Sequence, residues 1–415
     1  DLFVYPGAFT ISDNHVTVPG GITLQSQQAI VKFMLKDADG NDLNATSLTV
    51  RDVAKDMQGG GSHISQSPLV VTPPTEATNV FYVAINGLDI ADKHSDIVLT
   101  ATTASGDIYT YTKEYDEQHP VYFEHGKYYA IQVKMTKPAL VDLSMVDCAG
   151  KARTDGMWTA NCYMVHTAGY YKLPLVYGNA IKAGAANTVA YNPGEKTTDN
   201  PYCANFVNHA GTAINAPWIT KSTDGTGVNK GMDINVNSAE LLWQDAQGLV
   251  TAVGISEDGD YLTLTVGKDA ATQEGNALVA AKDADGIIVW SWHIWVTKQT
   301  FATATLTTIN TGSHTYSVTP VNLGWVGDAI SATGYQTYYQ WGRKDAFFPG
   351  TGTGNTNHTV YDINGAEVTE GLTYVTSNPT VTIADNIKNP TTFYRVGEKV
   401  GTQETDKPST AEFFN

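Results

Sequence analysis

The chain has 415 residues with 42 acidic and 25 basic side chains, a formal net charge of −17. A protein with this negative charge repels the phosphate backbone of nucleic acids and the surface of anionic membranes. We therefore expect neither as a partner. Hydrophobic residues make up 42% of the chain, enough for packed cores, while only 16% are charged and 38 are glycine. This composition favours strands and tight turns, and the length predicts roughly two to four domains.

The first 137 residues show the period-two alternation of half-buried strands. One strand places four apolar side chains on a single face: Ala29, Val31, Phe33 and Leu35. A hairpin turn follows at 37–42, where Gly40 can adopt a positive φ. Further strands are predicted at 79–84, 96–102, 108–112 and 127–137. Short strands at this spacing, separated by turn signals, predict a β-sandwich over residues 1–137.

Residues 138–300 are predicted to form a second β-rich domain. Strands are expected at 160–165 and 169–177, and a hairpin is expected to pair 240–244 with 249–255. A longer hairpin turns at 283–286 and returns as the strand 287–296. On that strand, one face carries Trp290, Trp292 and Ile294, and the other carries Ser291, His293 and Trp295. A strand with indoles on both faces is predicted to be covered on both, by a loop or a neighbouring domain.

The last part of the chain, residues 301–415, is expected to form a loop-rich, mainly β domain. Helical patterns are scarce throughout, so the predicted fold class is all-β, with tandem β-sandwich modules followed by this C-terminal domain. No run of about 18 apolar residues is present, so no segment is predicted to span a bilayer.

The chemistry-bearing residues match no catalytic template. The closest approach to a nucleophile elbow, at 254–258, lacks the second glycine. Two Asp-Ala-Asp-Gly tetrads, at 37–40 and 283–286, begin like calcium loops but place glycine fourth instead of sixth, so hairpin turns are the favoured interpretation. Four nearby residues are interpreted as solvated loop residues: Glu117, His119, Glu124 and His125. We therefore expect no enzyme, no metal and no cofactor.

Three cysteines, Cys148, Cys162 and Cys203, form an odd set without CxxC spacing, which excludes a zinc ribbon. Small buried thiols are the favoured interpretation, and a bridge from Cys148 to Cys203 is the alternative.

Aromatic patches are the candidate ligand-binding surface. The residues concerned are Trp290, Trp292, Trp295, Tyr338, Tyr339, Trp341 and Arg343. Exposed, these rings would offer stacking platforms to sugars. Core packing is the favoured alternative, because indoles in strands are usually buried.

Three blocks of sequence resemble parts of Bacteroidetes surface proteins. Segments 24–33 and 123–129 resemble the second sandwich domain of the fimbrillin family, the type V pilins. Segments 160–163 and 290–297 resemble a domain often appended in fimbrillin-like proteins. Segments 322–325 and 338–345, the latter reading YYQWGRKD, resemble the start of the Fibrobacter-type major paralogous domain, so residues 301–415 would be a partial copy of it.

This resemblance implies an outer membrane lipoprotein displayed at the cell surface or on the fimbrium. Its implied role is structural or adhesive, as a tip or accessory subunit of a pilus. Other pilus subunits would join by strand addition, and host or neighbouring-cell glycans or surface proteins would be ligands. The lipid anchor would lie outside this chain, which would be a fragment or a processed form. The alternatives are a glycan-binding surface lipoprotein outside a pilus and, least favoured, a polysaccharide hydrolase.

Overall fold

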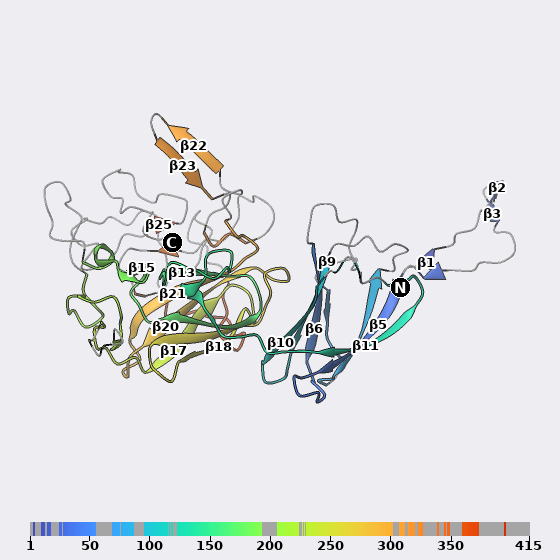
Figure 1. The fold of residues 1–415 in the computed structure, drawn as a ribbon, viewed down its shortest axis with the longest axis horizontal. Coiled ribbons are helices and arrows are strands. Elements are labelled where there is room, and N and C mark those ends of the chain that lie inside the picture. Colours follow the sequence, from blue (N-terminus) through green and yellow to red (C-terminus); the bar gives the residue numbers. More distant parts are fainter. Residues whose placement is uncertain are drawn as a thin grey trace. The chain divides into compact units, whose positions relative to one another are not determined.

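In the computed structural model of the chain, the regular secondary structure is almost wholly β-strand (Figure 1). Within the described residues the helical elements are two short 3-10 turns, Leu143–Met145 and Thr188–Ala190, which confirms the all-β prediction. No helix in this part of the chain is long and apolar enough to cross a membrane. The structure describes residues 3–4, 10–12, 15–17, 25–26, 28–54, 69–74, 76–86, 95–114, 116, 118, 123–192, 206–223, 226, 228, 230–301, 307–311, 314–319, 323–326, 338–339, 344–345, 347–348, 359–372 and 394–395.

The chain divides into two compact units, Asp1–Pro138 and Ala139–Asn415. The division falls next to the boundary expected after residue 137. The described residues beyond 300 belong to the second unit, so the structure gives no separate unit that begins at 301.

The first unit holds two main sheets. One is antiparallel, in the order β10 (Ile108–Lys113), β9 (Ser95–Thr102), β6 (Ser47–Ala54) and β7 (Leu69–Val71). The other has the order β11 (Tyr128–Lys134), β5 (Gln28–Lys36) and β8 (Val80–Asn86), with β11 parallel to β5. Two small pairs precede them: β1 (Phe3–Val4) with β4 (Gln25–Ser26), and β2 (Thr10–Ser12) with β3 (His15–Thr17). Both main sheets contribute side chains to one hydrophobic core.

Strand β5 shows how the sequence pattern produces this core. Its buried and half-buried residues alternate along all nine positions, and the buried ones are the four predicted: Ala29, Val31, Phe33 and Leu35. Because successive side chains of a strand point to opposite faces, this single alternation places the strand with one face in the core.

A five-residue turn follows β5 and recurs along the chain. In the first copy, Oδ1 of Asp37 accepts hydrogen bonds from the backbone N–H groups of Asp39 and Asn41, both at 2.9 Å. Gly40 takes a φ of 91°, which glycine adopts without strain. Equivalent side-chain bonds form in the turns 147–151, 208–212, 283–287 and 362–366. The two Asp-Ala-Asp-Gly tetrads are therefore turns whose leading carboxylate is engaged by backbone amides.

The second unit also holds two main sheets. The first has the order β12 (Val141–Asp142), β14 (Gly169–Pro174), β19 (Tyr261–Val266) and β18 (Val250–Ile255). The second has the order β13 (Cys162–Val165), β21 (Ile288–Val296), β20 (Gly275–Lys282) and β17 (Ser238–Gln244). Shorter pairs are β15 (Ile181–Lys182) with β16 (Ala185–Ala186), β22 (Thr307–Thr311) with β23 (His314–Val318), and β24 (Tyr338–Tyr339) with β25 (Tyr394–Arg395).

One predicted pairing in this unit is wrong. Residues 240–244 and 249–255 do form consecutive strands, but β17 pairs with β20 and β18 pairs with β19, in different sheets. The turn at 245–248 passes from one sheet to the other, and both strands turn side chains into the same core, among them Leu241 and Val250. The long hairpin of β20 and β21 forms as predicted.

Candidate functional site

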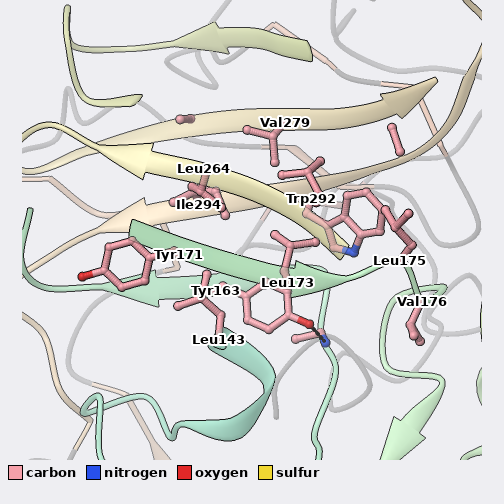
Figure 2. Close-up of a cluster of buried hydrophobic side chains, with 14 of the residues drawn as sticks. Leu143, Tyr163, Tyr171, Leu173, Leu175, Val176, Leu264, Val279, Trp292 and Ile294 are labelled. Atoms are coloured by element: carbon pink, nitrogen blue, oxygen red, sulfur yellow. Dashed lines mark hydrogen bonds between the residues drawn. The ribbon is translucent and has the colours of Figure 1, made fainter. Parts of the chain in front are cut away.

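Strand β21 carries the three tryptophans of the predicted binding surface. Trp292 is 1% exposed and lies in the core between the two sheets, close to Leu173, Leu175 and Val279 (Figure 2). Trp295, on the opposite face, is 0% exposed. Its ring lies 5.7 Å from that of Phe301, and its Nε1 donates to the Trp325 carbonyl oxygen at 3.0 Å. Neither indole can stack on a sugar, which corrects the prediction of a binding platform at these two residues.

Trp290 is half-buried and also serves packing. Its ring meets that of Tyr177 edge-on at 5.4 Å, and its Nε1 donates to Oδ1 of Asn161 at 3.2 Å. The other predicted binding residues lie later in the chain. Tyr338 and Tyr339 form β24, but their side chains lie outside the described part, as do Trp341 and Arg343 entirely.

Later residues of the chain cover the outer face of the sheet that contains β21. Trp243 and Leu278 pack there against Phe348 and Val360. Ser291 Oγ donates to the Lys344 carbonyl oxygen at 2.8 Å. Strand β21 is therefore covered on both faces, as the indoles on both sides predicted.

A buried polar network lies beneath this cover. His293 Nε2 lies 2.8 Å from Oδ1 of Asn276. The Asn276 amide nitrogen donates to Oδ2 of Asp245 at 2.8 Å and to the Gly324 carbonyl oxygen at 2.9 Å. Burial lowers the pKa of His293 to about 3 and raises the pKa of Asp245 to about 6. The sequence analysis did not identify this network. The signal that could have revealed it is a polar residue within each of two strongly apolar strands, Asn276 in β20 and His293 in β21.

A cavity of about 220 Å³ lies elsewhere in the second unit, beside the start of β13. Its walls are mostly apolar, with Arg153 and Asp147 as charged members. The lining residues include Cys148, Arg153, Trp158, Cys162, Met164 and Phe301. The guanidinium carbon of Arg153 lies 5.1 Å from the centre of the Trp158 ring, and Lys182 Nζ lies 5.2 Å from it.

Two of the three cysteines line this cavity. Cys148 and Cys162 are half-buried and are both in the thiol form. The alternative bridge from Cys148 would end at Cys203. Cys203 itself lies outside the described residues. Burial, with a smaller contribution from the nearby Asp147 charge, raises the pKa of the Cys148 thiol. The thiol donates to the Thr300 carbonyl oxygen at 3.3 Å, so this side chain is held protonated and acts in packing.

In the described part of the chain, no group of three His, Cys, Asp or Glu side chains is placed to hold a metal ion. Of the four residues interpreted as solvated, Glu124 is exposed and His125 is half-buried, while Glu117 and His119 lie outside the described residues.

The first unit presents an exposed aromatic face. Tyr82 lies opposite Lys32 and Tyr128 lies opposite Ile30, so both tyrosines share the face of β5 that turns away from the core. The two side chains are 57% and 58% exposed, and Lys32 Nζ lies 6.0 Å from the centre of the Tyr82 ring. The strands that carry them, β8 and β11, are the edges of their sheet among the described residues.

No family model, no curated protein and no solved structure matches this chain. The fimbrillin resemblance therefore depends on its sequence blocks alone.

Proposed function

We propose that this chain is a cell-surface, pilus-associated structural or adhesion protein, of the fimbrillin type, that acts through strand and surface contacts. It works as a tip or accessory subunit and is held at the outer membrane as a lipoprotein. Its partners are other pilus subunits, and its ligands are host or neighbouring-cell surface molecules. It carries out no reaction.

The observation that carries this proposal is the edge strand β11. Among the described residues it pairs on one side only, with β5, and runs parallel to it. An unpaired edge offers a row of backbone N–H and C=O groups that a strand from another subunit can extend. On β11 the outward residues Tyr128, Ala130 and Gln132 are all exposed, so this face of the strand is open. Directly after the strand, Thr136 exchanges two backbone hydrogen bonds with Thr110 of β10, so the unpaired edge ends there.

Site-specific photo-crosslinking in pilus-bearing cells tests the proposal. A photoreactive residue at Gln132, on β11, is expected to give one discrete adduct with a pilus subunit, and the chain is expected to co-purify with pili. The matched control places the same residue at Asp285, an exposed turn position in the second unit. Absence of both the adduct and the co-purification contradicts the proposal. Turnover of a polysaccharide that stops when one carboxylate is replaced would instead support the hydrolase.

A second candidate, a glycan-binding surface lipoprotein outside a pilus, is favoured by one observation. Tyr82 and Tyr128 share an exposed sheet face, and aromatic rings on such a face can stack on sugar rings. A glycan array tests it with the double variant Tyr82→Ala, Tyr128→Ala. Binding that disappears in the double variant, without co-purification with pili, would favour this candidate over the first.

A further inference from the structure

The cavity beside β13 has the construction of a small-molecule site. Ligand sites are concave, mostly apolar and marked by a few placed polar groups. Here apolar and aromatic side chains form most of the wall, and Arg153 is one of the lining residues. We propose that this cavity binds a small aromatic monocarboxylate, a single ring that carries one carboxylate group. The inference is independent of the proposed role in pili.

The size of the cavity sets the size of the ligand. An apolar cavity of about 150 Å³ accepts a benzene molecule. The volume here is about 220 Å³, which leaves room for the ring and one attached carboxylate group.

The wall favours an aromatic ring over an aliphatic chain. Trp158 and Phe301 supply aromatic surface, which prefers edge-on or offset contact with another ring. Three sulfur-containing residues also line the cavity: Cys148, Cys162 and Met164. Sulfur next to an aromatic ring is a favourable contact.

Arg153 selects the charged group. Its Nε donates to the Val146 carbonyl oxygen at 3.0 Å, and its plane lies near Trp158, so the guanidinium is held in place. Its terminal N–H groups make no hydrogen bond with any residue that the structure describes. Such a group receives a carboxylate through two parallel hydrogen bonds. Asp147 also lines the cavity, and its negative charge disfavours a doubly charged ligand such as a phosphate.

The backbone conformation of Phe301, which lines the cavity, also supports a ligand site here. Phe301 has a φ of 42°, a left-handed conformation that residues with a Cβ rarely adopt. Such conformations persist where the surroundings enforce them, and they are concentrated at ligand sites. Phe301 packs its ring against Trp295, so a buried tryptophan holds this wall residue in position.

The test uses the full chain and phenylacetate as the probe, with phenylacetamide as its uncharged isostere. Saturation-transfer NMR is expected to show saturable, millimolar binding of phenylacetate, and binding of the amide that is weaker by about tenfold. Alkylation of Cys148 and Cys162 by iodoacetamide, followed by peptide mass spectrometry, is expected to slow by about threefold or more near saturation, because the ligand covers both thiols.

Two single variants test whether Arg153 contacts the carboxylate of phenylacetate. Arg153→Gln is expected to weaken phenylacetate binding by about tenfold and to leave phenylacetamide binding nearly unchanged. Lys151→Gln, an exposed cation in the adjacent turn, is expected to leave both unchanged. The proposal is overturned if wild-type protein gives neither transfer nor thiol protection, or if it binds both probes equally. That wild-type comparison decides the question even if Arg153→Gln fails to fold.

Discussion

The Nε2 atom of His293 lies 2.8 Å from Oδ1 of Asn276, and this contact fixes the direction of the buried network. Burial lowers the pKa of His293 to about 3, so the imidazole is neutral near neutral pH. Nε2 must therefore carry the proton that it donates to the amide oxygen. Asn276 in turn donates its amide hydrogens to Asp245 and to the Gly324 carbonyl oxygen. One side chain thus joins strands β20 and β21 to the segment that covers them.

Replacing Asn276 with leucine should lower the free energy of unfolding of the second unit by about 2–4 kcal/mol. The change leaves the Asp245 carboxylate and the His293 N–H without their amide partner in a buried site. All eight tryptophans lie after residue 157, so tryptophan fluorescence during urea unfolding follows this unit alone. The control Asn364→Leu, at an exposed turn position, should cost less than about 0.5 kcal/mol. Equal small costs for both variants would show that the network contributes nothing.

The two titrating groups of the network should have opposite effects on stability. The pKa of Asp245 rises from 3.8 to about 6, so the folded unit holds this proton more tightly than the unfolded chain does. Its contribution to stability is full below pH 3.8 and is lost as the pH rises through about 6. The pKa of His293 falls from 6.5 to about 3, so its contribution is full above pH 6.5 and is lost as the pH falls toward 3.

Single variants should separate these effects. Relative to the wild type, Asp245→Asn should give an unfolding free energy that rises with pH between about pH 4 and 6, by up to about 1.4 kcal/mol per unit, because only the histidine of the network then titrates. His293→Gln should give the reverse slope, and the wild type should be nearly flat in this interval. Urea unfolding at a series of pH values measures all three profiles. If the unfolding free energy of both variants changed with pH in the same way as that of the wild type, the pKa shifts assigned to Asp245 and His293 would be wrong.

The sequence predicted the positions of the strands better than it predicted which strands pair with each other. Strand β5 follows from alternation alone, because one face of its sheet is buried. The pairing of β17 does not, since the choice between β18 and β20 depends on how two sheets close around a shared core. A short turn between two strands favours a hairpin locally, and tertiary packing overrides that preference here.

The candidate site shows the same limit. The indoles on both faces correctly predicted that β21 is covered on both sides, and the burial of Trp292 and Trp295 agrees with the core packing that the sequence favoured over a sugar-binding surface. The cavity was not predicted, because Phe301 and Leu323 join the lining residues of the stretch 143–164 only in the folded unit. Spacing along the chain carries no signal for such a site.

The two enclosed indoles should differ in their response to substitution. Trp295→Phe loses the hydrogen bond to the Trp325 carbonyl oxygen, whereas the buried Nε1 of Trp292 has no hydrogen-bond partner to lose. Both changes leave a similar void, so the phenylalanine variant at 295 should be less stable than that at 292 by about 1 kcal/mol. Urea unfolding followed by circular dichroism, which does not depend on the replaced fluorophore, makes the comparison. The reverse order would mean that packing differences outweigh this hydrogen bond.

The recurring turn offers a last prediction, at Asp283. Its Oδ1 accepts from the N–H groups of Asp285 and Ile287, and its Oδ2 lies 3.2 Å from Nε2 of His209. Asp283→Ala removes all three contacts and should destabilise the second unit by about 1–2 kcal/mol. Asp285→Ala, in the same turn, removes an exposed carboxylate that accepts none of these bonds and should change stability by less than about 0.5 kcal/mol.

Asp283→Asn separates the turn from the histidine contact. The amide oxygen still accepts the two backbone hydrogen bonds, while the negative charge that faces His209 is lost. If the turn supplies most of the stabilisation, the asparagine variant should unfold in urea close to the wild type, and Asn208 already fills the same position in another copy of this turn. If the asparagine variant is instead as unstable as the alanine variant, the contact between Asp283 and His209, and not the capped turn, is what holds the β20–β21 hairpin to residues 208–212.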